Sequence, residues 1–143
     1  SHGAVSVSAP ETDLHAGVNA ILGAVSPATK LFFIANPNNP TGTMLSPDAL
    51  RELQDQLPPH VLLVVDGAYA EYVSEDYERE MRDLVDRKDN TVMIRTFSKI
   101  YGLASLRLGW GYFPQHVAET IQRVRGPFNV NGLAVAAGIA SLE

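Results

Sequence analysis

Hydrophobic residues along the chain occur either in short continuous runs or in longer stretches where they recur every three or four positions. The short runs, rich in β-branched residues, predict five strands, at residues 4–8, 31–35, 61–65, 91–95 and 108–113. The longer stretches predict helices at residues 13–25, 47–57, 77–88, 115–124 and 130–143. Strands that alternate with helices in this way are typical of an α/β fold, with a mostly parallel sheet and helices on both of its faces.

Local signals refine several of these elements. Ser46 is placed to cap the helix that follows it, with Pro47 at the first helical position. The runs LFFIA and VLLVV are continuously apolar, so we expect both strands to lie in the middle of the sheet. The last helix is nearly all Ala, Gly, Leu, Ile and Val and should be buried, yet no later segment could cover it. We therefore expect the 143 residues to be part of a larger polypeptide.

The composition narrows the classes of function. A length of 143 residues suits one domain, and 45% hydrophobic with 19% charged residues is ordinary for a globular chain. The net charge is -5 and the basic residues are scattered, which argues against nucleic-acid binding. The chain has no cysteine, its histidines lack metal-ligand spacing, and no apolar run reaches the roughly 18 residues of a membrane span. We therefore expect a cytoplasmic protein without disulfides, a metal site or a membrane anchor.

Polar and charged side chains cluster just after the predicted strands, where the ligand sites of open parallel sheets collect. These residues are Asn39, Asp66, Tyr69, Thr96, Ser98, Lys99 and Arg107. Each has an ordinary structural explanation when taken alone: a turn for the asparagine, a helix cap for the aspartate, a surface position for the lysine and a salt bridge for the arginine. Their concentration at the strand ends favours a shared site instead.

One ligand would use all of these groups. Pyridoxal 5'-phosphate needs a lysine amine for its aldehyde, a carboxylate at its ring nitrogen and an anion site for its phosphate. Its phenolic oxygen accepts hydrogen bonds from donors such as Asn and Tyr, and hydroxyl groups together with an arginine can bind phosphate. The residues therefore indicate a pyridoxal-phosphate site in which Lys99 is the nucleophile.

This interpretation is strengthened by four runs of the sequence, NPNNPTGT, VVDGAYAEY, RTFSKIYGLASLRLGWGY and RGPFNVN. In order, and over nearly the whole chain, they resemble the central part of the large domain of fold-type I pyridoxal-phosphate aminotransferases, and most closely the histidinol-phosphate branch. Each run alone would be a weak signal, but the set is specific. The resemblance implies that residues 1–143 are a partial cofactor-binding large domain.

The resemblance also implies a role for individual residues. Lys99 matches the family lysine that forms a Schiff base with the cofactor and later moves the substrate proton. Asp66 matches the carboxylate that pairs with the pyridinium nitrogen. Asn39 and Tyr69 match the donors to the phenolic oxygen, and Ala68 matches the small residue packed under the ring.

The phosphate contacts of the family correspond to Thr96, Ser98 and Arg107, and the Asn39–Pro40 peptide is expected to be cis. Other family features have no counterpart in these residues. A further phosphate-binding loop and a stacking aromatic residue come from an upstream segment, and the arginine for the substrate carboxylate comes from a small C-terminal domain. Family members are homodimers in which the partner contributes a tyrosine to the phosphate, so we expect a homodimer.

The resemblance implies a two-stage transfer of an amino group between L-histidinol phosphate and 2-oxoglutarate, in histidine biosynthesis. An aromatic amino acid aminotransferase or a related pyridoxal-phosphate decarboxylase stays open as an alternative, because most substrate contacts of the family lie outside these residues. The alternative from another class is a truncated, non-catalytic domain that folds and self-associates.

Overall fold

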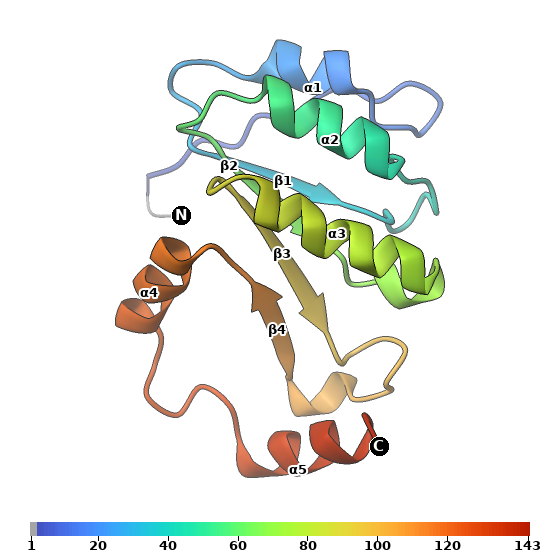
Figure 1. The fold of residues 1–143 in the computed structure, drawn as a ribbon, viewed down its shortest axis with the longest axis vertical. Helices are drawn as coiled ribbons and strands as arrows, with labels where there is room; N and C mark the ends of the chain where they lie inside the picture. Colours follow the sequence, from blue (N-terminus) through green and yellow to red (C-terminus); the bar gives the residue numbers. More distant parts are fainter. Residues whose placement is uncertain (1–2) are drawn as a thin grey trace.

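Residues 3–143, which the computed structural model describes, form a four-stranded sheet and five α-helices (Figure 1). The strands are β1 (Leu31–Ala35), β2 (Leu62–Asp66), β3 (Thr91–Thr96) and β4 (Gly109–Tyr112). Their order in the sheet is β1-β2-β3-β4, and β1, β2 and β3 run parallel while β4 is antiparallel to β3. The predicted α/β class with a mostly parallel sheet is therefore confirmed.

The helices connect and flank the strands. They are α1 (Val18–Ala24), α2 (Pro47–Gln56), α3 (Glu75–Arg87), α4 (Gln115–Val124) and α5 (Gly132–Ala140), together with the 3-10 turns η1 (Ala70–Tyr72) and η2 (Ala104–Leu106). α4 and α5 lie beyond β4, at the end of the molecule opposite α1 (Figure 1). Among residues 3–143, no helix combines the length and the apolar character that a membrane span requires.

The sheet has two distinct faces, because successive side chains of a strand point to opposite sides. On the face toward α2 and α3, Leu63, Val65 and Met93 are buried in one core cluster with apolar side chains of both helices. Each such side chain contributes about 1.5–3 kcal/mol of hydrophobic stabilisation when it is fully buried. On the other face, Leu31 and Phe33 of β1 keep 52% and 64% of their surface exposed. The core of the described chain therefore lies on the α2 and α3 side.

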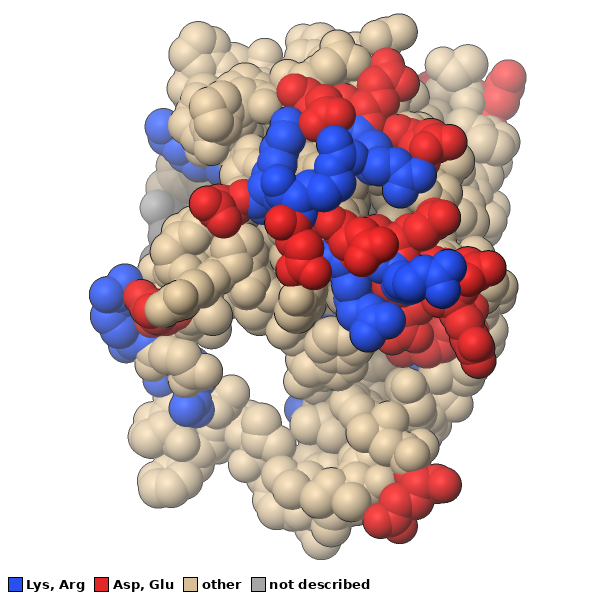
Figure 2. Space-filling model, in the orientation of Figure 1, with Lys and Arg blue, Asp and Glu red and all other residues tan. Residues whose placement is uncertain are grey.

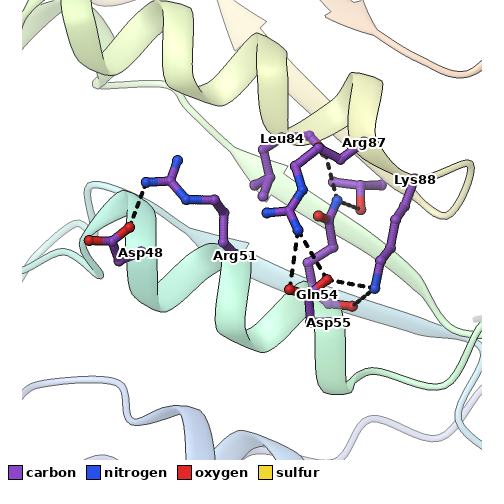
Figure 3. Close-up of polar contacts among 8 residues, drawn as sticks. Asp48, Arg51, Gln54, Asp55, Leu84, Arg87 and Lys88 are labelled. Atoms are coloured by element: carbon purple, nitrogen blue, oxygen red, sulfur yellow. Dashed lines mark hydrogen bonds and ion pairs between the residues drawn. The ribbon is translucent and has the colours of Figure 1, made fainter.

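A buried glutamine holds α2 against α3 and β3. Gln54 is 1% exposed, and its Nε2 donates to the Leu84 carbonyl oxygen at 2.6 Å and to the Thr91 hydroxyl oxygen at 2.7 Å. Figure 3 shows these contacts crossing from one helix to the other. A buried amide is tolerated when it finds partners of this kind, and here it fixes the relative position of three elements.

Charged side chains form a second link between the same helices at the surface. Asp55 of α2 pairs with Lys88 at 2.8 Å and with Arg87 at 3.1 Å (Figure 3). The hydrogen bond from Lys88, followed by the charge of Arg87, lowers the pKa of the Asp55 carboxyl group below its ordinary value. Figure 2 shows that most of the charged side chains in this view gather over α2 and α3. Exposed pairs of this type add about 0–1 kcal/mol each, so the buried contacts dominate the packing.

The predicted strands are confirmed at four of the five positions, within one or two residues of their expected ends. The strand expected at residues 4–8 is wrong, because these residues are exposed and pair with no strand of the described sheet. The expectation that β1 lies in the middle of the sheet is also wrong. β1 is an edge strand whose only described neighbour is β2, whereas β2 is central as predicted. A continuous apolar run therefore does not distinguish a central strand from an edge strand.

Two predicted helices differ from those observed. α1 begins at Val18 instead of residue 13, because Asp13 and Leu14 adopt left-handed backbone angles with φ of 50° and 64°. α5 was expected to be buried, but only its small residues are: Ala134 and Gly138 are buried, whereas Leu133 stays 75% exposed. α2 matches its prediction, with Ser46 accepting a hydrogen bond as the N-terminal cap and Pro at the start.

Candidate active site

The carboxyl ends of the three parallel strands meet at one edge of the sheet. In the register of the sheet, Ala35 lies opposite Asp66, and Asp66 lies opposite Ile94. Thr96 follows Ile94 by two positions, so alternation places the Thr96 and Asp66 side chains on the same face. β4 starts at this edge as well, where Gly109 pairs with Thr96. Residues from four separate parts of the chain therefore gather there.

Three predicted site residues from separate loops meet at this edge. Asn39 Nδ2 donates to the Tyr69 hydroxyl oxygen at 2.9 Å, and Lys99 Nζ lies 5.1 Å from the centroid of the Tyr69 ring. An ammonium group at this distance from an aromatic face gains about 0.5–1 kcal/mol at an exposed site. An amide, a phenol and an amine are therefore brought together around one aromatic ring.

The loop after β1, which carries Asn39, is closed by its own hydrogen bonds. Asn38 Nδ2 donates to the Thr41 hydroxyl oxygen at 2.8 Å, and the Gly42 amide donates to the Asn38 carbonyl oxygen at 2.9 Å. Gly42 has a φ of 70°, which favours glycine at this position. The Asn39–Pro40 peptide is cis, as predicted, and Asn36–Pro37 is a second cis peptide that was not predicted.

A buried asparagine that sequence analysis did not single out anchors this loop. Asn36 is 1% exposed; its Oδ1 accepts from the Leu45 amide at 2.7 Å, and its Nδ2 donates to the Leu45 carbonyl oxygen at 3.0 Å and the Tyr77 hydroxyl oxygen at 2.7 Å. The Tyr77 hydroxyl in turn donates to the Asn36 carbonyl oxygen at 3.0 Å. Burial raises the pKa of the Tyr77 phenol, although the hydrogen bond with Asn36 opposes this effect. The asparagine thus joins both ends of the loop to α3.

Asp66 ends β2 with a carboxylate that is only partly engaged. Its Oδ1 accepts a hydrogen bond from the amide of Ala68 at 3.0 Å. Among residues 3–143 the carboxylate forms no ion pair, and its Oδ2 accepts no hydrogen bond from the chain. Asp66, Ala68 and Tyr69 are all half-buried. A carboxylate in this state can still pair with a cationic group of a ligand.

The segment after β3 supplies hydroxyls and an arginine. The Ser98 amide donates to the Thr96 hydroxyl oxygen at 3.0 Å, and Arg107 Nη1 donates to the Ser98 hydroxyl oxygen at 3.3 Å. The same nitrogen donates to the Ala104 carbonyl oxygen at 2.8 Å, which fixes the guanidinium group beside η2. Arg107 has a left-handed backbone, with a φ of 56°. The structure therefore brings Thr96, Ser98 and Arg107 together as expected.

The two cations of the site are not neutralised by the described chain. Neither Lys99 nor Arg107 lies within ion-pair distance of a carboxylate among residues 3–143. The structural salt bridge that could have explained Arg107 is therefore not observed in this part of the chain. A guanidinium group bonded to the Ser98 hydroxyl, with the Thr96 hydroxyl two residues away along the chain, suits an anionic ligand such as a phosphate.

A groove of about 870 Å³ lies elsewhere, between residues 3–11 and β1. Its lining includes Phe32, Ile34 and Asn36 but none of Asp66, Tyr69, Lys99 and Arg107. The groove follows the side of β1 that pairs with no described strand, and its wall is largely apolar. Because none of the reactive side chains lines it, the candidate active site lies outside the groove. The convergence of reactive side chains at the strand ends is the better guide to the site.

Comparison with known families gives one match over nearly the whole chain. The family described as aminotransferase class I and II matches residues 2–143. Histidinol-phosphate aminotransferase of Hyphomonas neptunium is 71% identical over 140 residues, which cover 98% of this chain and 38% of that protein. The enzyme of the same name from Rhodospirillum centenum is 55% identical, over 99% of this chain and 39% of the relative. The chain thus spans less than two fifths of these relatives.

Solved structures agree with the sequence relatives. The crystal structure of histidinol-phosphate aminotransferase from Sinorhizobium meliloti in complex with pyridoxal-5'-phosphate has a TM-score of 0.87 and 34% identity, covering 95% of this chain and 37% of that one. L-threonine-O-3-phosphate decarboxylase from Porphyromonas gingivalis has a TM-score of 0.73 and 26% identity, covering 87% of this chain and 38% of that one.

Proposed function

The chain belongs to the class I and II aminotransferases, and from this membership we propose that it is the central part of the cofactor-binding large domain of a histidinol-phosphate aminotransferase. The proposed reaction transfers an amino group between L-histidinol phosphate and 2-oxoglutarate in histidine biosynthesis. The cofactor is pyridoxal 5'-phosphate. The remainder of the large domain and a small domain would come from outside these residues, since the chain spans 38% of the relative from Hyphomonas neptunium.

The observation that carries the proposal is the meeting of Lys99, Tyr69 and Asn39 at the sheet edge. Pyridoxal 5'-phosphate supplies an aldehyde that condenses with an amine and a ring that accepts electrons from the bond being broken. Such a ligand needs a free amine, a carboxylate and an anion site. Among the described residues, 3–143, the Lys99 amine forms no ion pair and the Asp66 carboxylate has no cationic partner. The residues present therefore fit the cofactor.

Each residue would hold a different part of that cofactor. Lys99 would bind the aldehyde carbon through its amine and then carry a proton at that same nitrogen. Asp66 would keep a proton on the ring nitrogen, and Asn39 and Tyr69 would donate hydrogen bonds to the phenolic oxygen. The small side chain of Ala68 would leave space for the flat ring.

The phosphate group would lie against Thr96, Ser98 and Arg107. Their hydrogen bonds to one another hold the hydroxyls and the guanidinium in one place before any ligand arrives, which reduces the entropy lost on binding. Arg107 supplies the positive charge that a phosphate requires, and no carboxylate of residues 3–143 competes for it.

The substrate assignment rests on the relatives. The relatives from Hyphomonas neptunium, Rhodospirillum centenum and Dinoroseobacter shibae are 71%, 55% and 54% identical, and all three are histidinol-phosphate aminotransferases. We propose that the protein acts in the cytoplasm as a homodimer whose second subunit completes the phosphate site. A pyridoxal-phosphate decarboxylase is the second candidate, supported by the similarity to the Porphyromonas gingivalis decarboxylase.

The test begins with cofactor binding. The native polypeptide that contains this chain is purified and titrated with pyridoxal 5'-phosphate, and a visible absorption band that persists after gel filtration is expected. Lys99→Ala should abolish the band, whereas Lys88→Ala, which removes a surface lysine paired with Asp55, should leave it unchanged. A band that survives in Lys99→Ala would refute the assignment of the lysine.

Activity is then measured on the native polypeptide that contains this chain. Formation of glutamate from histidinol phosphate and 2-oxoglutarate is expected, and release of carbon dioxide from a phosphorylated amino acid would favour the decarboxylase instead. A protein that binds the cofactor and yields neither product would support the non-catalytic alternative.

A further inference from the structure

A buried arginine lies directly beneath the candidate site. The Arg95 side chain is 1% exposed, and its Nη2 pairs with Glu71 Oε1 at 2.8 Å and, more weakly, with Glu78 Oε1 at 3.7 Å. The Glu71 side chain is itself only 10% exposed. The guanidinium carbon lies 5.4 Å from the ring centroid of Trp110, on the neighbouring strand β4. Arg95 is thus enclosed by a carboxylate and an aromatic face.

The pair joins the two segments that carry the site. Glu71 lies in η1, two residues after Tyr69, and Arg95 is the residue before Thr96 in β3. The backbone of Gly67, in the loop that precedes η1, is also in close contact with the arginine stem. A Cβ atom added at Gly67 would come within 2.9 Å of Arg95 Cδ. The Asp66–Tyr69 loop therefore rests on the arginine side chain.

Stability alone does not account for this arrangement. Burying two charges costs several kcal/mol each, and apolar side chains of similar volume stabilise a fold as well or better. The pair is also incompletely satisfied, because Arg95 Nε and Glu71 Oε2 are buried without a hydrogen-bond partner within the described residues. An ion pair that is buried and incompletely hydrogen-bonded is better explained by a role in positioning the segments that carry it than by a gain in stability.

We propose that the Arg95–Glu71 ion pair is a positioning element of the active site, which sets the separation between the Asp66–Tyr69 loop and the β3 end that carries Thr96, Ser98 and Lys99. This inference rests on the proposed function. Neither residue touches the cofactor; the pair acts through the backbone of the loop above it. The Trp110 ring, whose centroid lies 5.4 Å from the guanidinium carbon, limits the space open to the arginine on the β4 side.

The test replaces the pair by apolar residues of similar size, Arg95→Met with Glu71→Leu, in the native polypeptide that contains this chain. The urea midpoint should stay equal to or above that of the parent, because the buried charges are removed together. The dissociation constant for pyridoxal 5'-phosphate should rise about fivefold or more, which corresponds to about 1 kcal/mol. The pH midpoint of the visible band should shift, since the distance between Lys99 and Asp66 is no longer fixed.

A readout without the cofactor accompanies these measurements. In the double variant, hydrogen exchange at the Gly67 and Ala70 amides, which bond to the Ile94 and Gly67 carbonyl oxygens, should be about fivefold faster in the apo protein. The same substitutions at the exposed pair, Arg87→Met with Asp55→Leu, serve as the control and should change neither the exchange nor the affinity.

The outcomes separate this inference from the proposed function. A parent protein without a visible band would refute the proposed function and the inference with it. A parent that binds, with a double variant of unchanged affinity, band midpoint and amide exchange, would overturn the positioning role alone. If the double variant does not fold, Arg95→Lys decides: it keeps the charge but loses the planar guanidinium, and it should weaken binding. Parent-like binding in Arg95→Lys would likewise overturn the role.

Discussion

Asn36→Ala is expected to destabilise the protein more than any change at an exposed residue of the same loop. The side chain makes three hydrogen bonds, two with the Leu45 backbone and one with the Tyr77 hydroxyl. Leu45 lies at the far end of the loop, and Tyr77 belongs to α3. Removing the amide therefore affects both the anchoring of the loop and the packing of α3.

The size of the effect follows from these contacts. Each hydrogen bond contributes about 0.5–1.5 kcal/mol net, and a buried donor left without a partner costs about 1–3 kcal/mol. Asn36 is 1% exposed, so water cannot easily replace the lost contacts. We expect a loss of about 3–5 kcal/mol in the free energy of unfolding, a large part of the about 5–15 kcal/mol typical of a native protein.

Urea unfolding followed by circular dichroism measures this loss by linear extrapolation. The matched control is Asn39→Ala, because Asn39 is exposed and makes one side-chain hydrogen bond, to Tyr69. The control should lose less than about 1 kcal/mol, yet it should weaken cofactor binding. Equal unfolding free energies for the two variants would refute the anchoring role of Asn36.

Three further outcomes are expected. Burial raises the pKa of the Tyr77 phenol in the folded protein, so the contribution of this group to stability is full below the unfolded value of about 10 and is lost as the pH rises through the folded value. The pKa values of Tyr101 and Tyr112 are raised as well, so Tyr77→Phe should reduce the alkaline loss of stability in a pH series of urea midpoints without abolishing it; an unchanged loss would contradict the contribution of Tyr77. Ser46→Ala removes the acceptor for the Ala49 amide at 3.2 Å and should lower the free energy of unfolding by about 1 kcal/mol; no change in the urea midpoint would contradict the cap. Asp66→Ala should reduce turnover more than cofactor retention, whereas Arg107→Ala should weaken retention by about 1.5–3 kcal/mol; equal effects on kcat and on the cofactor dissociation constant in both variants would contradict the assigned roles.

Much of the fold could be predicted because local signals agree with the tertiary structure. The run LFFIA lies between Lys30 and the Asn36–Pro37 step, which limits β1 to five residues. Ser46 and the proline after it define the start of α2. The position of β1 in the sheet could not be predicted in the same way, because an apolar run carries no information on how many neighbours pair with it.

The candidate site likewise contains residues that could be predicted from the sequence and residues that could not. Lys99 and Asp66 could be located because reactive side chains stand out when they follow apolar strands. Asn36 was missed because its meaning depends on Tyr77, 41 positions away, and Arg95 was missed because it lies within a strand that reads as apolar. Partners that are distant in sequence and buried in the fold leave no local signal.

Within residues 3–143, one edge of β1 pairs with no strand, and this has a consequence for handling the isolated chain. An edge strand presents unpaired backbone groups that any extended peptide can bind, and Leu31 and Phe33 add exposed apolar surface to it. Five uncharged residues with high β-propensity are close to the length of a segment that nucleates amyloid-like stacking. Lys30, just before the strand, and Pro37, shortly after it, limit how far such intermolecular strand pairing can extend along the chain. Concentrated solutions of the chain should therefore aggregate through pairing at this edge of β1, and a charged residue introduced at Phe33 should delay the aggregation.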